Sequence, residues 1–383
     1  MSGSNYMEKL LDGVDVEWKP LGAVTTIKTG QSVNKQMISA NLGDYPVINS
    51  GREPLGFINI WNTNNDPIGV TTRGAGVGSI TWHEGKYYRG NLNYSVTINN
   101  NKKISTRYLY HLLLEMQADI QALCTYDGIP ALNADNFKEL RIPIPCPENP
   151  KKSLEIQAEI VQILDTFTEL TAELTAELTA RKKQYNYYRD QLLTEVYDST
   201  KEFTIGEIID MRAGKNIKAK DIAEIETSEH KYTCYGGNGS RGFVSNYSHD
   251  GNYVLIGRQG ALCGNVKREK GRFYATEHAV ACSPKDDVNI DWVFYMLTFM
   301  NLNQYKSRSA QPGLAVGNIA KLPIKVPPIE EQTRIVAILD KFDALTNSIT
   351  EGLPREIELR QKQYEYYRDL LLSFPKPDAE VAA

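Results

Sequence analysis

The sequence predicts an α+β fold in which two small mixed α/β domains are separated by a pair of long antiparallel coiled-coil-like helices, with a pseudo-twofold internal repeat. The first observation behind this prediction is a repeated phrase: RKKQYNYYRDQLL at 181–193 returns as RQKQYEYYRDLLL at 360–372. The second is an apolar repeat in steps of three and four residues before each phrase. The third is that the remaining sequence holds short β-like runs with Gly and Asn turns.

The first globular stretch is expected at residues 17–150, after an N-terminal helix end at 1–16. MEKLLDGVDVEW at 7–18 corresponds to RDQLLTEVYDSTKEF at 189–203, where a helix ends and a second globular stretch begins. The missing front half of the first helix matches the end of the chain, YYRDLLLSF at 366–374. We therefore expect the C-terminal helix to lie beside the N-terminus, in a cyclic pseudo-twofold arrangement.

A central long helix is expected over residues 151–200. Its apolar residues follow a spacing close to the 3.5-residue repeat of a coiled coil, and they are Ile156, Ile160, Ile163, Phe167, Leu170, Leu174 and Leu178. The run TELTAELTAELTA at 168–180 favours a helix longer than a small domain needs. We therefore expect this helix to pack antiparallel against a second one. An ordinary core helix in each half is the alternative, and both the length and the sustained repeat argue against it.

Three further segments complete the expected organisation: a second globular domain at 201–328, a C-terminal long helix at 329–374 and a flexible tail at 375–383. The C-terminal helix repeats QAEIVQILDTF at 157–167 as QTRIVAILDKF at 332–342. Gly352 and Pro354 interrupt its pattern, so we expect a kink or a short break there.

Both globular stretches carry, at matching places, residue types that bind nucleic acid. A strand leads to an arginine and a glycine-rich turn at Arg73 and at Arg258, and KTGQ at 28–31 matches RAGK at 212–215. Such loops offer backbone amides to phosphates and side chains to base edges. For any single position, an ordinary β-turn with a solvated arginine is the alternative. The candidate DNA-binding residues are Lys28, Gln31, Asn49, Arg52, Arg73, Gly74, Lys86, Arg89, Asn91, Asn93, Arg212, Lys215, Asn238, Arg241, Arg258, Gln259, Arg272 and Tyr274.

Composition and charge narrow the class of protein. With 41% hydrophobic and 23% charged residues, the chain should fold around hydrophobic cores. The sequence has no apolar run of membrane-spanning length, so we expect the protein in the cytoplasm. A net charge of −4 argues against simple electrostatic coating of DNA, so binding would be local and geometric or helped by partners. The cysteines form no CxxC pair and the histidines fall singly, so we expect reduced cysteines and no metal.

Catalytic motifs are mostly missing from the sequence. It has no GxxxxGK[ST] phosphate loop and no NPPY or DPPY segment of the kind amino-methyltransferases use. GNGSRG at 237–242 fits GxGxxG, but the residues after it do not read as a helix. We therefore expect no catalytic residue and no cofactor-binding residue in this chain.

The doubled plan, with its QxEIVxILDxF and RKKQYxYYRDxLL phrases, resembles the specificity subunit of Type I restriction-modification systems over essentially the whole chain. The TAEL run and the tail at 347–377 look like the IC subgroup. The resemblance implies two target-recognition domains, 17–150 and 203–328, each reading one half of a bipartite asymmetric sequence in the major groove of double-stranded DNA. It also implies that the helices act as a ruler for the spacer between the two halves.

The same resemblance implies partners and the cofactors that they carry. Two modification subunits would bind S-adenosylmethionine and methylate adenine at N6, and restriction subunits would use ATP and Mg²⁺ for translocation and cleavage. The candidate contacts with modification subunits are Gln157, Ile160, Phe167, Gln332, Ile335 and Phe342. Two other classes stay open: a coiled-coil adaptor that binds proteins through its globular ends, and a nuclease or methyltransferase that acts alone.

Overall fold

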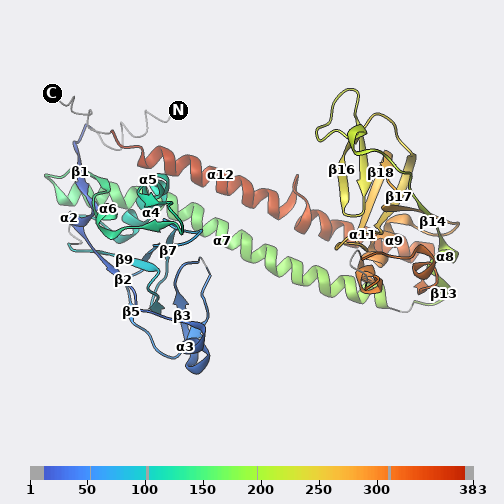
Figure 1. Cartoon of the computed structure of the whole chain (residues 1–383), viewed down its shortest axis with the longest axis horizontal. Coiled ribbons are helices and arrows are strands. Elements are labelled where there is room, and N and C mark those ends of the chain that lie inside the picture. Colours follow the sequence, from blue (N-terminus) through green and yellow to red (C-terminus); the bar gives the residue numbers. More distant parts are fainter. Residues whose placement is uncertain (1–12, 52, 101–102, 196, 309–311, 376–383) are drawn as a thin grey trace. The chain divides into compact units, whose positions relative to one another are not determined.

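The computed structural model describes residues 13–51, 53–100, 103–195, 197–308 and 312–375. The chain divides into two compact units, which we call unit 1 and unit 2. Unit 1 comprises Met1–Leu174 and Ile357–Ala383, and unit 2 comprises Thr175–Glu356. Each unit holds a sheet-rich mixed α/β domain and parts of the long helices, as the sequence predicts (Figure 1). Of the N-terminal helix end predicted at 1–16, residues 1–12 lie outside the described residues, as do residues 376–383 of the predicted tail.

In the described part of unit 1 there are two four-stranded sheets and two strand pairs. The first sheet has the order β2 (Thr25–Thr29), β9 (Asn93–Ile98), β6 (Ile68–Thr71), β7 (Ile80–Trp82). The second has the order β4 (Phe57–Ile58), β3 (Leu42–Ile48), β8 (Lys86–Arg89), β5 (Thr63–Asn64). The pairs are β1 (Val16–Pro20) with β12 (Arg141–Pro145), and β10 (Cys124–Thr125) with β11 (Ala131–Leu132). The short helices are α2 (Leu21–Val24), α3 (Lys35–Ala40), α4 (Thr106–Glu115), α5 (Gln117–Ala122) and α6 (Ala134–Lys138).

Unit 2 gathers the corresponding strands into one six-stranded sheet. Its order is β14 (Ile209–Ala213), β19 (Ala279–Pro284), β17 (His249–Gly257), β18 (Val266–Ala275), β15 (Tyr232–Gly236), β16 (Gly239–Val244). A separate pair joins β13 (Lys201–Thr204) to β20 (Pro323–Val326). The helices of the domain are α8 (Ile205–Ile208), η1 (Ala219–Asp221), α9 (Ile290–Phe299), η2 (Leu302–Tyr305) and α10 (Val316–Ile319).

The two domains share an unusual parallel strand pairing, which supports the internal repeat. In unit 1, Val47 of β3 lies opposite Tyr88 of β8, and in unit 2, Cys234 of β15 lies opposite Tyr274 of β18. Among the described residues, the long β18 pairs with both β15 and β17, whereas the four-residue β8 pairs with β3 and β5. The joining of six strands into one sheet of unit 2 therefore follows from the greater length of β17, of nine residues, and β18, of ten.

Three separate parts of the chain build the core of unit 1. Apolar strand residues such as Val70 pack with Leu109 of α4, with Ile160 of the central helix and with Leu372 near the C-terminus. The indole nitrogen of Trp18 also donates a hydrogen bond of 2.8 Å to the Pro375 carbonyl oxygen. The end of the C-terminal helix therefore lies beside the first described strand, β1, whereas the N-terminus itself lies outside the described residues and its predicted place beside this helix stays a prediction.

The central helix, α7, runs without a break from Pro150 to Thr194. In unit 1 its Phe167 stacks on Tyr367, with ring centroids 5.1 Å apart. In unit 2 its Tyr188 stacks on Phe342, with centroids 5.9 Å apart. Each contact joins the phenylalanine of one copy's motif to the tyrosine of the other copy's motif. This reciprocity is the pattern that a pseudo-twofold pair of helices requires.

The C-terminal helix is interrupted where the sequence predicts a break. α11 (Ile329–Asn347) ends before Ser348, and α12 (Gly352–Leu372) begins four residues later. Gly352 has a φ of +73°, and a β-carbon there would collide with the Ala344 carbonyl oxygen. A left-handed residue in so tight a place favours glycine, so Gly352 explains the break.

The apolar repeat at the start of α7 does not form the predicted contact between the two long helices. Ile156, Ile160 and Leu164 lie in the hydrophobic core of unit 1, beside α4. These first turns therefore belong to the domain, and the aromatic pairing of long helices begins at Phe167. Among the described residues, no helix is long and apolar enough to cross a membrane.

Candidate nucleic-acid interface

A chain of three backbone hydrogen bonds ties together four loops of unit 1. Gly30 N donates to Asn93 O (3.1 Å), Thr72 N donates to Leu92 O (3.0 Å), and Leu132 N donates to Thr72 O (2.9 Å). We call the four segments the loop cluster of unit 1; they are residues 28–31, 71–78, 90–93 and 130–132. The cluster unites Lys28, Gln31, Arg73, Gly74 and Asn91, all predicted from the sequence as DNA-binding residues.

The same chain of hydrogen bonds recurs in unit 2. Gly214 N donates to Ala279 O (3.0 Å), Arg258 N donates to His278 O (2.9 Å), and Leu314 N donates to Arg258 O (2.8 Å). The loop cluster of unit 2 comprises residues 212–215, 257–264, 276–279 and 312–314. It unites Arg212, Lys215, Arg258 and Gln259 among the predicted residues.

The glycines of the KTGQ and RAGK segments explain why these segments match. A β-carbon on Gly30 would collide with the carbonyl oxygens of Gly90 and Arg89, and one on Gly214 would collide with those of Ala275 and Thr276. Only glycine lets the chain cross so close to a neighbouring backbone. Because of this crossing, Lys28 and Gln31 lie in the loop cluster of unit 1 at the positions that Arg212 and Lys215 hold in the loop cluster of unit 2.

The glycine turns correct one predicted equivalence. Gly74 N donates to Pro130 O and Gly260 N donates to Pro312 O, both at 2.9 Å, and the two glycines have φ values of +93° and +96°. Gly74 therefore corresponds to Gly260. It follows that Arg73 corresponds to Gln259, and that the predicted match between Arg73 and Arg258 is wrong by one residue.

Exposure agrees with this corrected register, because a shift of one residue moves a side chain to the other side of extended backbone. Arg73 and Gln259 are both exposed. Thr72, the equivalent of Arg258, is buried, and Arg258 is half-buried. Among the described residues, the Arg258 Nε is buried and has no hydrogen-bond partner.

The predicted DNA-binding residues of the two units differ in their exposure to solvent. Those exposed are Lys28, Gln31, Arg73, Lys86, Asn91, Arg212, Lys215, Asn238, Arg241, Gln259 and Arg272. Those half-buried are Asn49, Gly74, Arg258 and Tyr274, and Arg52 lies outside the described residues. The Asn49 side-chain oxygen accepts a hydrogen bond of 2.9 Å from Leu92 N, which ties β3 to the loop cluster of unit 1.

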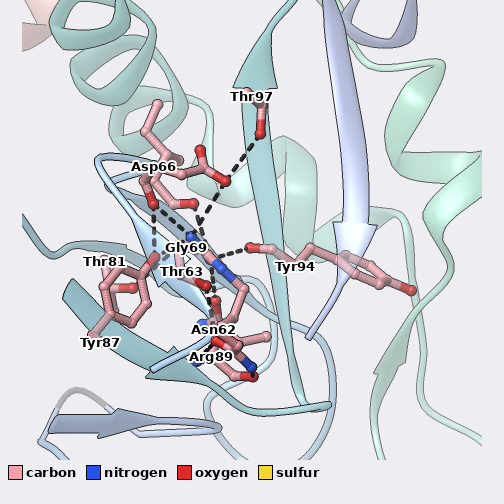
Figure 2. A network of polar contacts seen from close by, with 11 residues as sticks. Asn62, Thr63, Asp66, Gly69, Thr81, Tyr87, Arg89, Tyr94 and Thr97 are labelled. Atoms are coloured by element: carbon pink, nitrogen blue, oxygen red, sulfur yellow. Dashed lines mark hydrogen bonds and ion pairs between the residues drawn. The ribbon is translucent and has the colours of Figure 1, made fainter. Parts of the chain in front are cut away.

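Two of the predicted DNA contacts, Arg89 and Asn93, are buried inside unit 1, and for these two residues the prediction is wrong. The Arg89 guanidinium donates hydrogen bonds to Ile68 O (3.1 Å), Asn93 Oδ1 (2.6 Å), Tyr94 O (2.9 Å), Asp66 O (2.7 Å) and the Tyr87 hydroxyl. Figure 2 shows Arg89 among Asp66, Tyr87 and Tyr94, which supply three of these acceptors. Arg89 is 3% exposed and Asn93 is fully buried, so neither side chain lies on the protein surface, where DNA would bind.

The electrostatics of Arg89 match a structural role. Burial lowers its pKa, while the hydroxyl of Tyr87 and the carboxylate of Asp66, 3.8 Å away, favour the charged form. Burial raises the pKa of Tyr87, which keeps this phenol neutral. In the parallel pairing of unit 2, Ala275 takes the place of Arg89, so this network is specific to unit 1.

Two of the predicted partner contacts, Gln157 and Gln332, are fully buried and cap helices of their own domains. The Gln157 Oε1 accepts a hydrogen bond of 2.8 Å from Ser105 N, and the Gln332 Oε1 accepts one of 2.8 Å from Asn289 N. Ser105 and Asn289 are the N-cap residues of α4 and α9. The prediction that these glutamines contact a partner is therefore wrong.

Ile160 and Ile335 are also fully buried, so the partner prediction is wrong for them too. They lie in the hydrophobic cores of unit 1 and unit 2. Phe167 and Phe342 are half-buried in the aromatic stacks between the long helices. Their contact with a partner stays a prediction.

An aspartate in each motif makes a further polar contact with the same domain helix, and this contact was not predicted from the sequence. We call the glutamine and the aspartate of each motif, with their partners, the clamp of that unit. Asp165 Oδ1 accepts hydrogen bonds of 2.8 Å from Arg107 Nε and from His111 Nε2 of α4. Asp340 Oδ1 accepts hydrogen bonds of 2.6 Å from Arg268 and from the Tyr295 hydroxyl of α9. The available signal was the repeated Leu-Asp pair, whose aspartate lies eight residues after each glutamine.

The clamps fix each domain to its long helix. The glutamine accepts a hydrogen bond from the N-cap residue of α4 or α9, and the aspartate accepts one from a residue within the same helix. Burial lowers the pKa of His111, so this side chain is neutral and its Nδ1 can accept from the Tyr364 hydroxyl, 3.2 Å away. Two polar contacts on one short helix define its direction as well as its position.

Removal of either glutamine should destabilise its own unit. Gln157→Ala should lower the free energy of unfolding of unit 1 by about 1–3 kcal/mol, because the Ser105 N–H and the Lys103 carbonyl lose the fully buried side chain with which they are hydrogen-bonded. Gln332→Ala should act equally on unit 2. Thermal denaturation of the full chain measures the change, with Gln162→Ala, an exposed glutamine of α7, as the matched control. Unchanged stability with weakened binding of a partner subunit would restore the original hypothesis.

Comparison with known proteins identifies relatives over nearly the whole chain. The family described as "Type I restriction modification DNA specificity domain" matches residues 13–181 and 197–359. The chain is 46% identical to the Type I restriction enzyme EcoprrI specificity subunit of Escherichia coli, over 92% of this chain and 93% of that protein. It is 36% identical to the EcoR124I/EcoR124II specificity subunit of Escherichia coli, over 99% of each.

Solved structures share the fold. The S subunit of a Type I restriction-modification system from M. genitalium superposes with a TM-score of 0.69 at 20% identity, covering 95% of this chain and 98% of that one. A chain from a study of complex assembly in the type I R-M system superposes with a TM-score of 0.58 at 14% identity.

Proposed function

The chain belongs to the specificity subunits of Type I restriction-modification systems, and on this premise we propose that its two loop clusters each read one half of a bipartite asymmetric DNA target. As a specificity subunit it is the non-catalytic DNA-recognition part of the restriction-modification complex, with two target-recognition domains.

The observation that supports the proposal most strongly is the repeated scaffold with different side chains. The same chain of backbone hydrogen bonds holds both loop clusters, and the same glycine crossing precedes each. At equivalent places the clusters present Lys28 and Arg212, Gln31 and Lys215, Arg73 and Gln259. Base edges are distinguished by side chains held at fixed positions in the major groove. One scaffold with two sets of side chains is therefore suited to two different half-sites.

Affinity in this account comes from a few local contacts. The whole chain is negative, at −4, so its own charge does not favour broad attraction to DNA. Lys28 and Arg73 in unit 1, with Arg212 and Lys215 in unit 2, offer exposed positive charge at the loop clusters. Partner subunits would add further phosphate contacts. The exposed candidates outside the clusters, such as Asn238 and Arg241, would contribute at the edge of each site.

The partners in this proposal are two modification subunits and the restriction subunits. The modification subunits would bind S-adenosylmethionine and methylate adenine at N6, and flipping of that base brings it into their active site. The restriction subunits would carry the ATP and Mg²⁺ chemistry. Within this chain, the exposed faces of α7 and α11 around Phe167 and Phe342 are the proposed docking surfaces for modification subunits.

Co-expression with the modification subunit tests the assignment. The chain should purify with that subunit in a 1:2 ratio, measured by native mass spectrometry, and the complex should transfer methyl groups to adenine in DNA. Modification subunits without this chain should bind S-adenosylmethionine but leave the DNA unmethylated. Equal methylation with and without the chain would contradict the proposed function.

A further inference from the structure

Arg73 and Gln259 occupy equivalent positions in the glycine turns of the two loop clusters. Among the described residues, neither side chain has a hydrogen-bond or ion-pair partner, although both are exposed. By contrast, Arg272 pairs with Asp250 at 3.0 Å, and the Lys86 ammonium lies 4.8 Å from the ring centroid of Trp61. A long polar side chain that is held at a fixed turn and left unpaired is available to a ligand.

The turn that carries each residue is open on its outer side. Gly74 and Gly260 follow them with positive φ, and a β-carbon built on either glycine would meet no atom within 4 Å. The turn can therefore approach a flat surface closely. The backbone is also restrained, because residue 73 forms an isolated β-bridge with Ala131 and residue 259 forms one with Gly313.

Exposed apolar side chains lie in or next to these segments. In unit 1, Tyr126 is 60% exposed and Ile129 is 68% exposed, in the loop that leads to the Ala131 bridge. In unit 2, Leu262 is 56% exposed within the glycine turn itself. Apolar groups beside polar base readers suit the major groove, where the thymine methyl group is an apolar contact.

We propose that Arg73 and Gln259 are the matched base-reading residues of the two domains, Arg73 for a guanine and Gln259 for an adenine. This proposal rests on the proposed function, because it names the residues that read within the loop clusters. Arginine forms two hydrogen bonds with the guanine O6 and N7, and glutamine forms two with the adenine N6 and N7. A phosphate contact would favour a positive charge in both domains, whereas this position holds a cation in one and a neutral amide in the other.

The reciprocal exchange of the two side chains tests the assignment. Arg73→Gln and Gln259→Arg are made separately in the full chain, co-expressed with the modification subunits, and the methylated sequences are mapped. Arg73→Gln should cost about 5- to 150-fold in discrimination at one guanine of the first half-site and shift that position toward adenine. Gln259→Arg should change one adenine of the second half-site toward guanine. In each variant the other half-site stays unchanged.

Two controls separate the possible outcomes. Arg141→Gln makes the same chemical change at an exposed strand residue outside the loop cluster, and should leave the motif as it is. Arg258→Gln tests the register, because the structure pairs position 259 with position 73. Altered base preference in Arg258→Gln with none in Gln259→Arg would overturn the proposal. So would an unchanged motif in both exchange variants while the wild-type complex methylates a bipartite target. If the wild-type complex itself methylates no bipartite target, the proposed function is contradicted instead.

Discussion

Deletion of residues 175–178, one TAEL unit of α7, should shorten the preferred spacer of the DNA target by about two base pairs and leave both half-sites unchanged. α7 is one continuous helix from Pro150 to Thr194, and it connects the domain of unit 1 to that of unit 2. Four residues correspond to about 6 Å of helix, close to the rise of two base pairs at about 3.4 Å each. The methylation rate on a series of duplexes that differ only in spacer length measures the shift.

The deleted residues lie between the contacts that α7 makes at Asp165 and Phe167 and the stack that it makes at Tyr188. Glu177→Gln is the matched control, since it removes the ion pair with Arg181 at 2.6 Å but keeps the helix length. This variant should keep the original spacer. A deletion variant that methylates with the original spacer preference would contradict the ruler role of α7.

Arg89→Ala should destabilise unit 1 more than any other substitution considered for this protein. The expected loss is about 3–5 kcal/mol in the free energy of unfolding, because removal of a buried charge leaves its partners without hydrogen bonds. Those partners include the Asn93 side chain and the backbone carbonyl oxygens of Ile68 and Tyr94. Differential scanning calorimetry of the full chain should show one transition lowered, that of unit 1, with the transition of unit 2 unchanged.

The same variant decides between a structural and a DNA-binding role for Arg89. The structural role predicts that, below the lowered transition, the salt dependence of DNA binding by the complex equals that of the wild type. Arg272→Ala is the control, because Arg272 is exposed and paired with Asp250, and it should leave the unfolding transition in place. Unchanged stability of Arg89→Ala together with a weaker salt dependence would show that Arg89 contacts phosphate after all.

The features that depend on local pattern could be predicted from the sequence. The two long helical phrases are periodic over many residues, so their similarity reveals the repeat and the helices together. The break in the C-terminal helix follows from Gly352, whose left-handed backbone few other residues adopt. The likeness of KTGQ and RAGK follows from a glycine that a close backbone crossing requires.

The predictions that were wrong concern residues whose burial depends on tertiary packing, which a local sequence pattern does not show. Arg89 ends a strand of mixed residues, KYYR, and nothing local distinguishes it from a solvated arginine. Its burial results from carbonyl groups supplied by β6 and β9 and from Asp66. Gln157 and Gln332 were found as a repeated motif, but a motif does not say whether the surface opposite is a partner or the protein's own domain. Here the domain helices α4 and α9 fill that place.

The equivalence of Arg73 and Arg258 failed for a geometric reason. Residue identity suggested the match, whereas the hydrogen bonds of Gly74 and Gly260 set the register one residue away. In extended backbone one residue reverses the direction of the side chain, so an error of one residue exchanges an exposed position for a covered one. Only the backbone contacts of the turn with residues 130–132 and 312–314 carry that information.

The central claim is that this chain directs methylation to one bipartite target through two domains. Its most direct test is long-read mapping of methylated adenine in DNA from a host that co-expresses the chain with its modification subunit. We expect a single asymmetric motif of two half-sites separated by a spacer of fixed length. Full modification activity without any methylated motif that depends on this chain would contradict it.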